Sequence, residues 1–342
     1  MTDPVLETLC LPLEDGTIAL PANGSALLLR ARTGEALRRL PRDKILCDQS
    51  FKPARDALAR DGFELRTPDH PAQSDLTLVL PPRQREEGRA LLVRAIRLTR
   101  DDGLVVAAVS NLEGAKTVES DLKRLTGTVT AMSKNKCRVF WARIDASRLD
   151  TALMEAWEQL DTPRPIADGR FVSRPGLFAW DHLDAGSRFL VDHLPAEMKG
   201  RVADLGAGFG YLSDEVLRRY AGVTHLDAIE GEARAVDLAR QNLATFGDRV
   251  TCHWLDATGP LPGTYDVVVS NPPFHIDRAD RHDLGQAFIR SAARALTLGG
   301  VLWMVANRHL PYEETLKAVF KAVAVAGENP NFKVFRATGP KT

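Results

Sequence analysis

In the second half of the chain, short runs of aliphatic and β-branched residues alternate with segments whose apolar positions recur at helical spacing. The runs predict strands over residues 201–205, 224–229, 250–255, 265–270, 300–305 and 333–337. A helix is predicted over residues 283–296, where apolar side chains recur every three or four positions. Strands that alternate with helices in this way are typical of a parallel α/β sheet.

The first half of the chain repeats the pattern of the second. Residues 75–82 read DLTLVLPP, in the same frame as DVVVSNPP at 266–273. Further on, DGLVVAAVSN at 102–111 parallels GGVLWMVAN at 299–307, and KCRVF at 136–140 parallels FKVF at 332–335. We infer an internal duplication of one α/β unit. The alternative is a chance similarity between two unrelated α/β domains.

A proline-rich stretch, Thr162–Pro165, follows a helix predicted over residues 147–160 and is the best candidate for a linker. A chain of 342 residues has the length of about two domains. We therefore expect two tandem Rossmann-like α/β domains, one over residues 1–160 and the other over residues 165–342.

The segment VADLGAGFG at residues 202–210 runs from a predicted strand through a glycine-rich turn into a helix predicted over 212–220. Gly206, Gly208 and Gly210 would let the backbone pass close beneath a ligand at the N-terminus of that helix. Such loops bind NAD, FAD or no ligand at all, so the loop alone does not identify its ligand and the neighbouring residues are needed.

Three acids surround this loop. Asp204 precedes the first glycine, where a cationic ligand can use it directly or through water. Glu230 ends the second strand, where a carboxylate chelates ribose hydroxyls, although it can also be an ordinary exposed acid. Asp256 follows the third strand and either accepts from an adenine amino group or forms a turn or helix cap.

The segment SNPPFH at residues 270–275 follows the fourth strand, at the edge of the sheet that faces the cofactor cleft. The Asn271 amide oxygen and the Pro272 carbonyl can accept both hydrogens of a planar amino group and aim its lone pair at a methyl donor. Pro272 and Pro273 stiffen the backbone, and Phe274 offers a face on which a base can stack. The alternative is that the two prolines only end a strand.

The first copy differs at these positions. It has no glycine-rich loop of this type, and Leu80 stands where the second copy has Asn271. Because an apolar side chain cannot accept a hydrogen bond from an amine, we expect the first copy to be catalytically inactive.

Composition and charge argue against several classes of protein. The 45 basic residues equal the 45 acidic ones, which argues against nucleic-acid binding by bulk charge, although local basic runs occur. The runs are Arg30, Arg32, Arg38, Arg39, Arg42 and Lys44, and Lys134, Lys136 and Arg138. Four scattered cysteines predict no zinc site and a reducing compartment. We expect a cytoplasmic protein without a metal or a membrane span.

Five segments together resemble the bacterial ribosomal RNA guanine-N2 methyltransferases: PGLF at 175–178, DAGS at 184–187, DLGAGFG at 204–210, SNPPFH at 270–275 and VANRHLPY at 305–312. The small-subunit methyltransferase C type is the most similar, and the large-subunit methyltransferase G type is nearly as similar over residues 300–312. That family has a duplicated class I methyltransferase fold with a degenerate first copy.

The resemblance implies S-adenosylmethionine as cofactor and ribosomal RNA or a ribosomal subunit as partner. We also expect the chain to act as a monomer. It implies that the glycine loop and Glu230 bind the cofactor, and that Phe178 and Asp184 line the mouth of the cofactor pocket. It also implies that Asn271 to Phe274 hold a flipped guanine, and that residues 1–160 serve folding and RNA docking.

Other functions stay open. Protein glutamine-N5 methylation and adenine-N6 methylation of nucleic acid present the same kind of amino group to Asn271. Phe274 favours a base, whereas tyrosine there would favour glutamine. From another class, the chain would be an RNA-binding module for ribosome assembly that does not catalyse. The intact glycine loop and Asn271 argue against that function.

Overall fold

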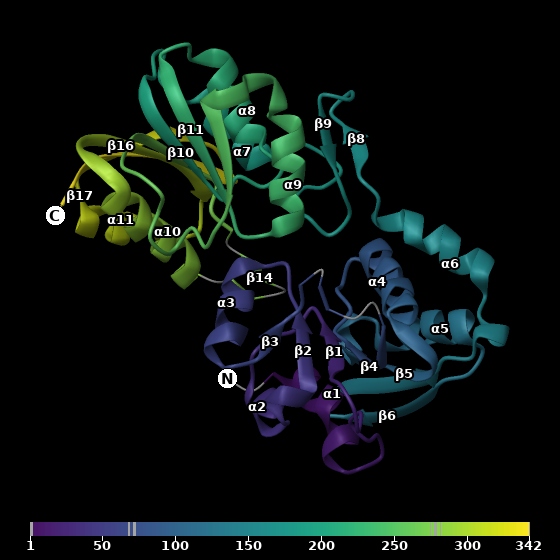
Figure 1. Cartoon of the computed structure of the whole chain (residues 1–342). Coiled ribbons are helices and arrows are strands. Elements are labelled where there is room, and N and C mark those ends of the chain that lie inside the picture. Colours follow the sequence, from purple (N-terminus) through teal and green to yellow (C-terminus); the bar gives the residue numbers. More distant parts are fainter. Residues whose placement is uncertain are drawn as a thin grey trace. The chain divides into compact units, whose positions relative to one another are not determined.

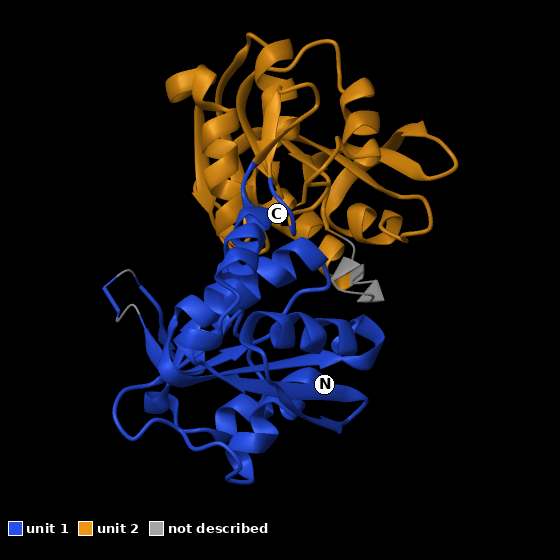
Figure 2. Cartoon of the chain, turned by 90° about the vertical axis from the view of Figure 1, so that its right-hand side faces the viewer, with its two compact units in different colours: residues 1–163, 174–176 blue, residues 164–173, 177–342 orange. Residues whose placement is uncertain are grey.

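The computed structural model describes residues 3–67, 69–70, 73–273, 275–276, 279–280 and 282–341. The chain divides into two compact units, coloured separately in Figure 2. Unit 1 comprises residues 1–163 and 174–176, and unit 2 comprises residues 164–173 and 177–342.

Unit 1 contains a seven-stranded sheet with the strand order β3-β2-β1-β4-β5-β7-β6. Its strands are β1 (Ala26–Leu29), β2 (Ile45–Asp48), β3 (Glu64–Leu65), β4 (Ser74–Val79), β5 (Thr99–Ser110), β6 (Thr130–Lys134) and β7 (Cys137–Arg143). Its helices are α1 (Pro4–Glu14), α2 (Glu35–Arg39), α3 (Lys52–Arg60), α4 (Arg85–Arg97), α5 (Ala115–Thr126) and α6 (Thr151–Glu158).

Unit 2 contains a second seven-stranded sheet with the order β12-β11-β10-β13-β16-β18-β17. Its strands are β10 (Gly200–Leu205), β11 (Val223–Glu230), β12 (Val250–Trp254), β13 (Tyr265–Ser270), β16 (Leu296–Asn307), β17 (Phe320–Glu328) and β18 (Phe332–Pro340). Its helices are α7 (Ala185–Asp192), α8 (Tyr211–Arg219), α9 (Ala233–Asn242), α10 (His282–Ala295) and α11 (Glu313–Val319) (Figure 1). Two hairpins complete it, β8 (Arg164–Ile166) with β9 (Phe171–Ser173), and β14 (His275–Ile276) with β15 (Ala279–Asp280).

The two sheets have the same topology. In each, five strands are parallel and the last two pair antiparallel at one edge. The segments that parallel each other in sequence occupy equivalent strands, because residues 102–110 belong to β5 and residues 299–307 to β16. The predicted fold class of two tandem Rossmann-like α/β domains is therefore confirmed.

The core of unit 2 lies on both faces of its sheet. Alternate residues of β10 point to opposite faces, so that Ala203 packs with α10 and α11 while Val202 packs with α7, α8 and α9. A parallel strand that is covered on both faces is mainly apolar, and in β10 the polar side chains Arg201 and Asp204 lie toward its two ends. Chemistry is thereby confined to the ends of the strands, where side chains leave the core.

Strand β17 is a feature that the sequence analysis did not predict. Its residues from Lys321 to Ala326 are mostly exposed, and alanine alternates there with valine. Pairing with β18 along the sheet edge holds this segment extended, although alanine by itself favours a helix. No helix among the described residues is long and apolar enough to cross a membrane.

Candidate active site

The glycine-rich loop joins β10 to α8 in unit 2. Gly206, Gly208 and Gly210 all have positive φ angles, of 78°, 55° and 99°. A Cβ atom added to Gly208 would meet no atom within 4 Å, so the need for glycine there comes from the backbone angle. The space beside Gly208 is therefore open, and the loop leads to the N-terminus of α8, where N–H groups favour a polar ligand.

Neighbouring residues anchor this loop from outside. The Phe209 ring packs 5.7 Å, between centroids, from the Phe171 ring of β9. The Asn242 side chain on α9 donates to the Phe209 carbonyl at 2.8 Å and to the Val172 carbonyl at 3.0 Å. The β8–β9 hairpin is thus bound to the loop, and these contacts hold the loop in its conformation without a ligand.

Asp204 lies at the end of β10 and is fully buried. Its Oδ2 accepts from the Ser213 hydroxyl at 2.7 Å, whereas its Oδ1 has no hydrogen-bond partner among the described residues. Burial, together with the nearby Glu230 carboxylate, raises the pKa of Asp204 to about 7. A buried carboxylate with an unpaired oxygen suits a site that receives a cationic or hydrogen-bonding ligand.

We expect the buried Asp204 to make stability depend on pH. Between its ordinary pKa of 3.8 and its pKa of about 7 in the fold, the folded protein holds more protons than the unfolded chain, so stability falls as pH rises through this window. Asp204→Asn keeps an uncharged side chain at every pH. Thermal unfolding of the free protein should therefore show a Tm difference, variant minus wild type, that is several degrees larger at pH 8 than at pH 5. Equal differences at the two pH values would contradict the assigned titration.

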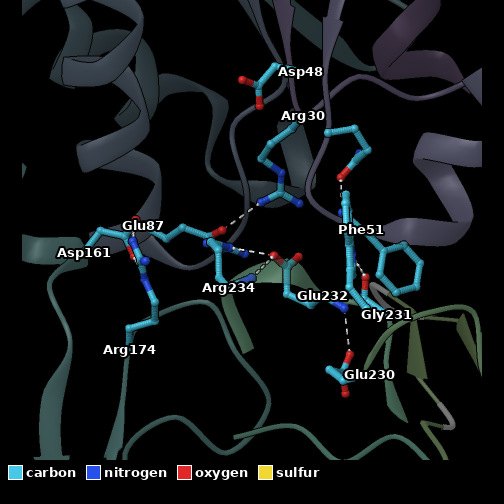
Figure 3. A network of polar contacts seen from close by, with 12 residues as sticks. Arg30, Asp48, Phe51, Glu87, Asp161, Arg174, Glu230, Gly231, Glu232 and Arg234 are labelled. Carbon is cyan, nitrogen blue, oxygen red and sulfur yellow. Dashed lines mark hydrogen bonds and ion pairs between the residues drawn. The ribbon is translucent and has the colours of Figure 1, made fainter. Parts of the chain in front are cut away.

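Glu230 ends β11 beside the same loop. Its Oε2 accepts from the Gly208 backbone N–H at 2.9 Å and its Oε1 from the Glu232 backbone N–H at 2.8 Å. Figure 3 shows the second contact, and next to it the hydrogen bond of 2.9 Å from Arg234 to Glu232. Burial raises the pKa of Glu230 above its ordinary value. Each carboxylate oxygen has two acceptor sites, so both retain capacity for a ligand hydroxyl.

Two other predicted cofactor residues have different surroundings. The Oδ1 of Asp256 accepts from the backbone N–H and the hydroxyl of Thr258, at 2.8 and 2.7 Å, which is the turn expected in the alternative interpretation. Phe178 is 63% exposed. Neither the turn at Asp256 nor the exposure of Phe178 by itself identifies a ligand.

The turn after β13 lies against the glycine loop. The Ser270 hydroxyl donates to the Leu205 carbonyl at 2.8 Å, which joins the ends of β13 and β10. The carbonyl oxygen of Asn271 is 3.8 Å from the position that a Cβ would take on Gly206. Pro272 is buried and Pro273 is exposed. Phe274 lies outside the described residues.

The side chain of Asn271 is held through its nitrogen. Its Nδ2 donates to Asp184 Oδ2 and to Ser187 Oγ, both at 2.8 Å. Asp184 is also the N-cap of α7, because the same Oδ2 accepts from the Ser187 backbone N–H at 2.7 Å. The predicted cofactor residue Asp184 therefore contacts Asn271, and the Asn271 Oδ1, which has no hydrogen-bond donor among the described residues, can act as an acceptor.

The site thus gathers residues from the carboxyl ends of β10, β11 and β13, together with the start of α7. Three further residues hold the predicted ones in place: Ser187, which is part of the DAGS segment but had no predicted contact, Ser213 and Asn242. Among the described residues no group of histidine, cysteine, aspartate or glutamate side chains could hold a metal ion.

The equivalent edge of unit 1 is built differently. After β1, Arg30 and Arg32 stand where the loop of unit 2 has Gly206 and Gly208. Arg30 pairs with Glu87 at 3.3 Å, which Figure 3 also shows, and Arg32 pairs with Asp3 at 3.2 Å. Two ion-paired arginines thus follow β1, where two glycines follow β10. The copy is degenerate, as predicted.

Comparison with known proteins gives three findings. The family model of the methyltransferase small domain matches residues 168–336. The ribosomal RNA small subunit methyltransferase C of Escherichia coli O81 is 30% identical over 272 residues, which cover 79% of this chain and 77% of that protein. The protein of the same name from Serratia proteamaculans is 28% identical over 267 residues, covering 78% of this chain and 75% of that one.

A solved structure extends the likeness to nearly the whole fold. The 16S rRNA N2 methyltransferase of T. thermophilus, determined in complex with AdoMet and guanosine, aligns with a TM-score of 0.81. The alignment covers 98% of this chain and 92% of that protein, at 24% sequence identity.

Proposed function

Because the chain belongs to the ribosomal RNA small subunit methyltransferase C family, we propose that it methylates the N2 amino group of a guanine in 16S rRNA. S-adenosylmethionine is the methyl donor in this family of enzymes. The observation that carries the proposal is the Asn271 amide, whose nitrogen is engaged at 2.8 Å by two acceptors so that its oxygen is left for a substrate amine.

The residues of unit 2 fit the cofactor. The open space beside Gly208 leaves room for a ligand against the backbone, and the Oδ1 of buried Asp204 is an acceptor without a donor among the described residues. We assign the glycine loop to the cofactor's polar part and the Glu230 carboxylate to its ribose hydroxyls. When bound, S-adenosylmethionine supplies an electrophilic methyl group on a sulfonium.

Asn271 and Pro272 act on the substrate amine. The guanine N2 is a poor nucleophile because its lone pair is delocalised into the ring. Two carbonyl acceptors, Asn271 Oδ1 and the Pro272 backbone oxygen, take its two hydrogens and turn the lone pair toward the methyl group. Positioning of this kind accounts for most of the acceleration, and the proton leaves after methyl transfer, so no strong base is needed.

Three further roles complete the proposal. Phe274 stacks on the base, and Phe178 lines the mouth of the cofactor pocket. We also propose that Asp256, whose Oδ1 accepts from Thr258, accepts from the adenine amino group with its other oxygen. A ribosomal RNA substrate fits the expected cytoplasmic location, and we propose that the protein acts as a monomer.

We propose that the first domain, residues 1–160, serves folding and RNA docking, while residues 165–342 catalyse. Ion pairs within unit 1 hold several arginines of its basic runs, since Arg38 contacts Asp61 at 2.9 Å and Arg39 contacts Glu7 at 2.8 Å. Exposed pairs of this kind contribute little to stability, so a phosphate can compete for these side chains.

Methyl transfer to three isolated acceptors tests the proposed substrate. The purified protein is given tritiated S-adenosylmethionine with 30S subunits, 50S subunits or a release factor. We expect label in the 16S rRNA of 30S subunits, because the family acts on small-subunit RNA. Label in 50S RNA would indicate the large-subunit relative, and label in the release factor would indicate glutamine-N5 methylation. No transfer to any acceptor, together with no thermal shift when S-adenosylmethionine is added, would favour an assembly module.

A further inference from the structure

A side-chain amide can sit in its site in two orientations that exchange oxygen and nitrogen. Only one of them gives Asn271 an acceptor for a substrate amine, because the other presents two donors. The turn after β13 fixes the backbone of Asn271 but does not by itself choose between these two orientations. Some neighbouring group must make that choice for the proposed chemistry to work.

The first turn of α7 supplies two acceptors at the required place. Asp184 Oδ2 and Ser187 Oγ each accept from Asn271 Nδ2 at 2.8 Å, and these two bonds use both hydrogens of the amide nitrogen. Ser187 is buried, with 7% of its surface exposed, so water does not replace this contact freely. In the exchanged orientation the Asn271 oxygen would face the Asp184 carboxylate, which has no hydrogen to donate when ionised.

The degenerate copy has the aspartate that caps the helix but lacks the serine that contacts the Asn271 amide. Helix α1 packs against β5 and β7 as α7 packs against β16 and β18, and its N-cap is also an aspartate, Asp3. Asp3 accepts from two backbone N–H groups of α1, at 3.1 Å each. Three residues after Asp3 stands Leu6, where the other copy has Ser187 three residues after Asp184.

Leu6 and Leu80 pack into the same apolar cluster of unit 1. Leu80 is the counterpart of Asn271, and Leu6 that of Ser187, so this copy lacks both the amide and the hydroxyl. The aspartate that caps the helix is present in both copies. Capping a helix at this position therefore does not require the serine. Ser187 accompanies Asn271 in the one copy that has the glycine loop.

We infer that Asp184 and Ser187 are positioning residues that hold the Asn271 amide with its oxygen toward the substrate, an inference that rests on the proposed function. They touch neither the substrate amine nor the methyl donor. Their loss leaves Asn271 in place but lets its amide turn, so that kcat falls while cofactor affinity and folding of the glycine loop persist.

Single substitutions measure this effect in the full-length protein. We expect Ser187→Ala to lower kcat for 16S rRNA methylation roughly tenfold, the effect of one hydrogen bond. Asp184→Ala should lower it further, by roughly 100-fold, since a charge-assisted bond is stronger. The Kd for S-adenosylmethionine, measured by calorimetry, should stay at the wild-type value in both variants. Asp184→Asn keeps an oxygen acceptor and a capping group and should restore most of the activity.

A matched control isolates the loss of the helix cap. Asp150 caps α6, which has eight residues like α7, and its Oδ1 accepts from the Leu153 N–H at 2.9 Å. Asp150→Ala should lower Tm by an amount similar to Asp184→Ala and leave kcat unchanged. An effect of Asp184→Ala on kcat is then not a consequence of capping.

Exchanging the carboxylate and the amide between positions 184 and 271 tests whether the two side chains act as a donor–acceptor pair. Asn271→Asp places a second carboxylate against Asp184, and we expect it to be nearly inactive. Adding Asp184→Asn to that variant again places an amide donor at one position opposite a carboxylate acceptor at the other. The kcat of the double variant should then be at least tenfold higher than that of Asn271→Asp alone, which is a non-additive effect. An additive double variant would overturn the inference.

The outcomes distinguish the inference from the function on which it rests. If the wild-type protein does not methylate 16S rRNA, the proposed function fails. If the wild type is active and Asn271→Ala is not, but Ser187→Ala and Asp184→Ala keep full kcat with only a lower Tm, the positioning role is wrong and the function stands.

Discussion

Replacing Asn271 with alanine is expected to reduce kcat for 16S rRNA methylation by about 10²–10³-fold or more, the size seen when one preorganised group of an active site is lost. Cofactor affinity should stay close to that of the wild type, because the contacts of Asn271 run to Asp184 and Ser187. Methyl transfer under saturating substrates gives kcat, and calorimetric titration with S-adenosylmethionine gives Kd.

Asn111→Ala is a suitable control for this experiment. Asn111 is exposed and follows β5 in the degenerate copy, so the same change of side chain there should leave both kcat and Kd unaltered. A Tm measurement excludes unfolding of the Asn271 variant. If Asn271→Ala lost cofactor binding together with activity, or kept its activity, Asn271 would not be the group that orients the substrate amine.

Glu230→Ala is expected to weaken cofactor binding by roughly 10–100-fold, since hydrogen bonds to a charged group contribute about 1.5–3 kcal/mol. Two causes act together. The carboxylate is lost as a partner of the ribose hydroxyls, and the Gly208 and Glu232 N–H groups lose the acceptors that shape the loop. Titration calorimetry with S-adenosylmethionine measures the change, and kcat at saturating cofactor should fall much less.

The degenerate copy offers a matched control for Glu230 as well. Asp48 ends β2 as Glu230 ends β11, and it pairs with Arg94 at 2.6 Å. Asp48→Ala removes a carboxylate from the equivalent strand end and should leave the cofactor Kd unchanged. Equal losses in the two variants, or an unchanged Kd in Glu230→Ala, would argue against a cofactor site beside the glycine loop of unit 2.

The parallel strands could be predicted because hydrophobic runs in the sequence mark them. Strands such as β10 and β13 are covered on both faces, so the middle of each is mainly apolar and stands out from the helices between them. Parallel strands then bring their carboxyl ends to one edge of the sheet, which is why motifs far apart in sequence could be placed together. The resemblance to ribosomal RNA guanine-N2 methyltransferases, drawn from these motifs, is confirmed.

The unpredicted part consists of single polar residues and of edge structure. Ser187 and Asn271 are separated by 84 positions, and no local pattern links a serine in a first helical turn to an amide after a strand. Asn242 likewise joins a helix, a hairpin and the glycine loop through one side chain. Strand β17 depends on its partner β18 for its conformation, since its alanine-rich sequence carries little preference for a strand.

Mass spectrometry of nucleosides from 16S rRNA tests the central claim most directly. Small subunits from a strain that lacks this gene are incubated with S-adenosylmethionine and either the wild-type protein or Asn271→Ala. We expect one new N2-methylguanosine in 16S rRNA with the wild type and none with the variant. A modified adenine, a methyl group in ribosomal protein, or N2-methylguanosine made equally by the variant would contradict the claim that the Asn271 turn presents a guanine amine to the donor.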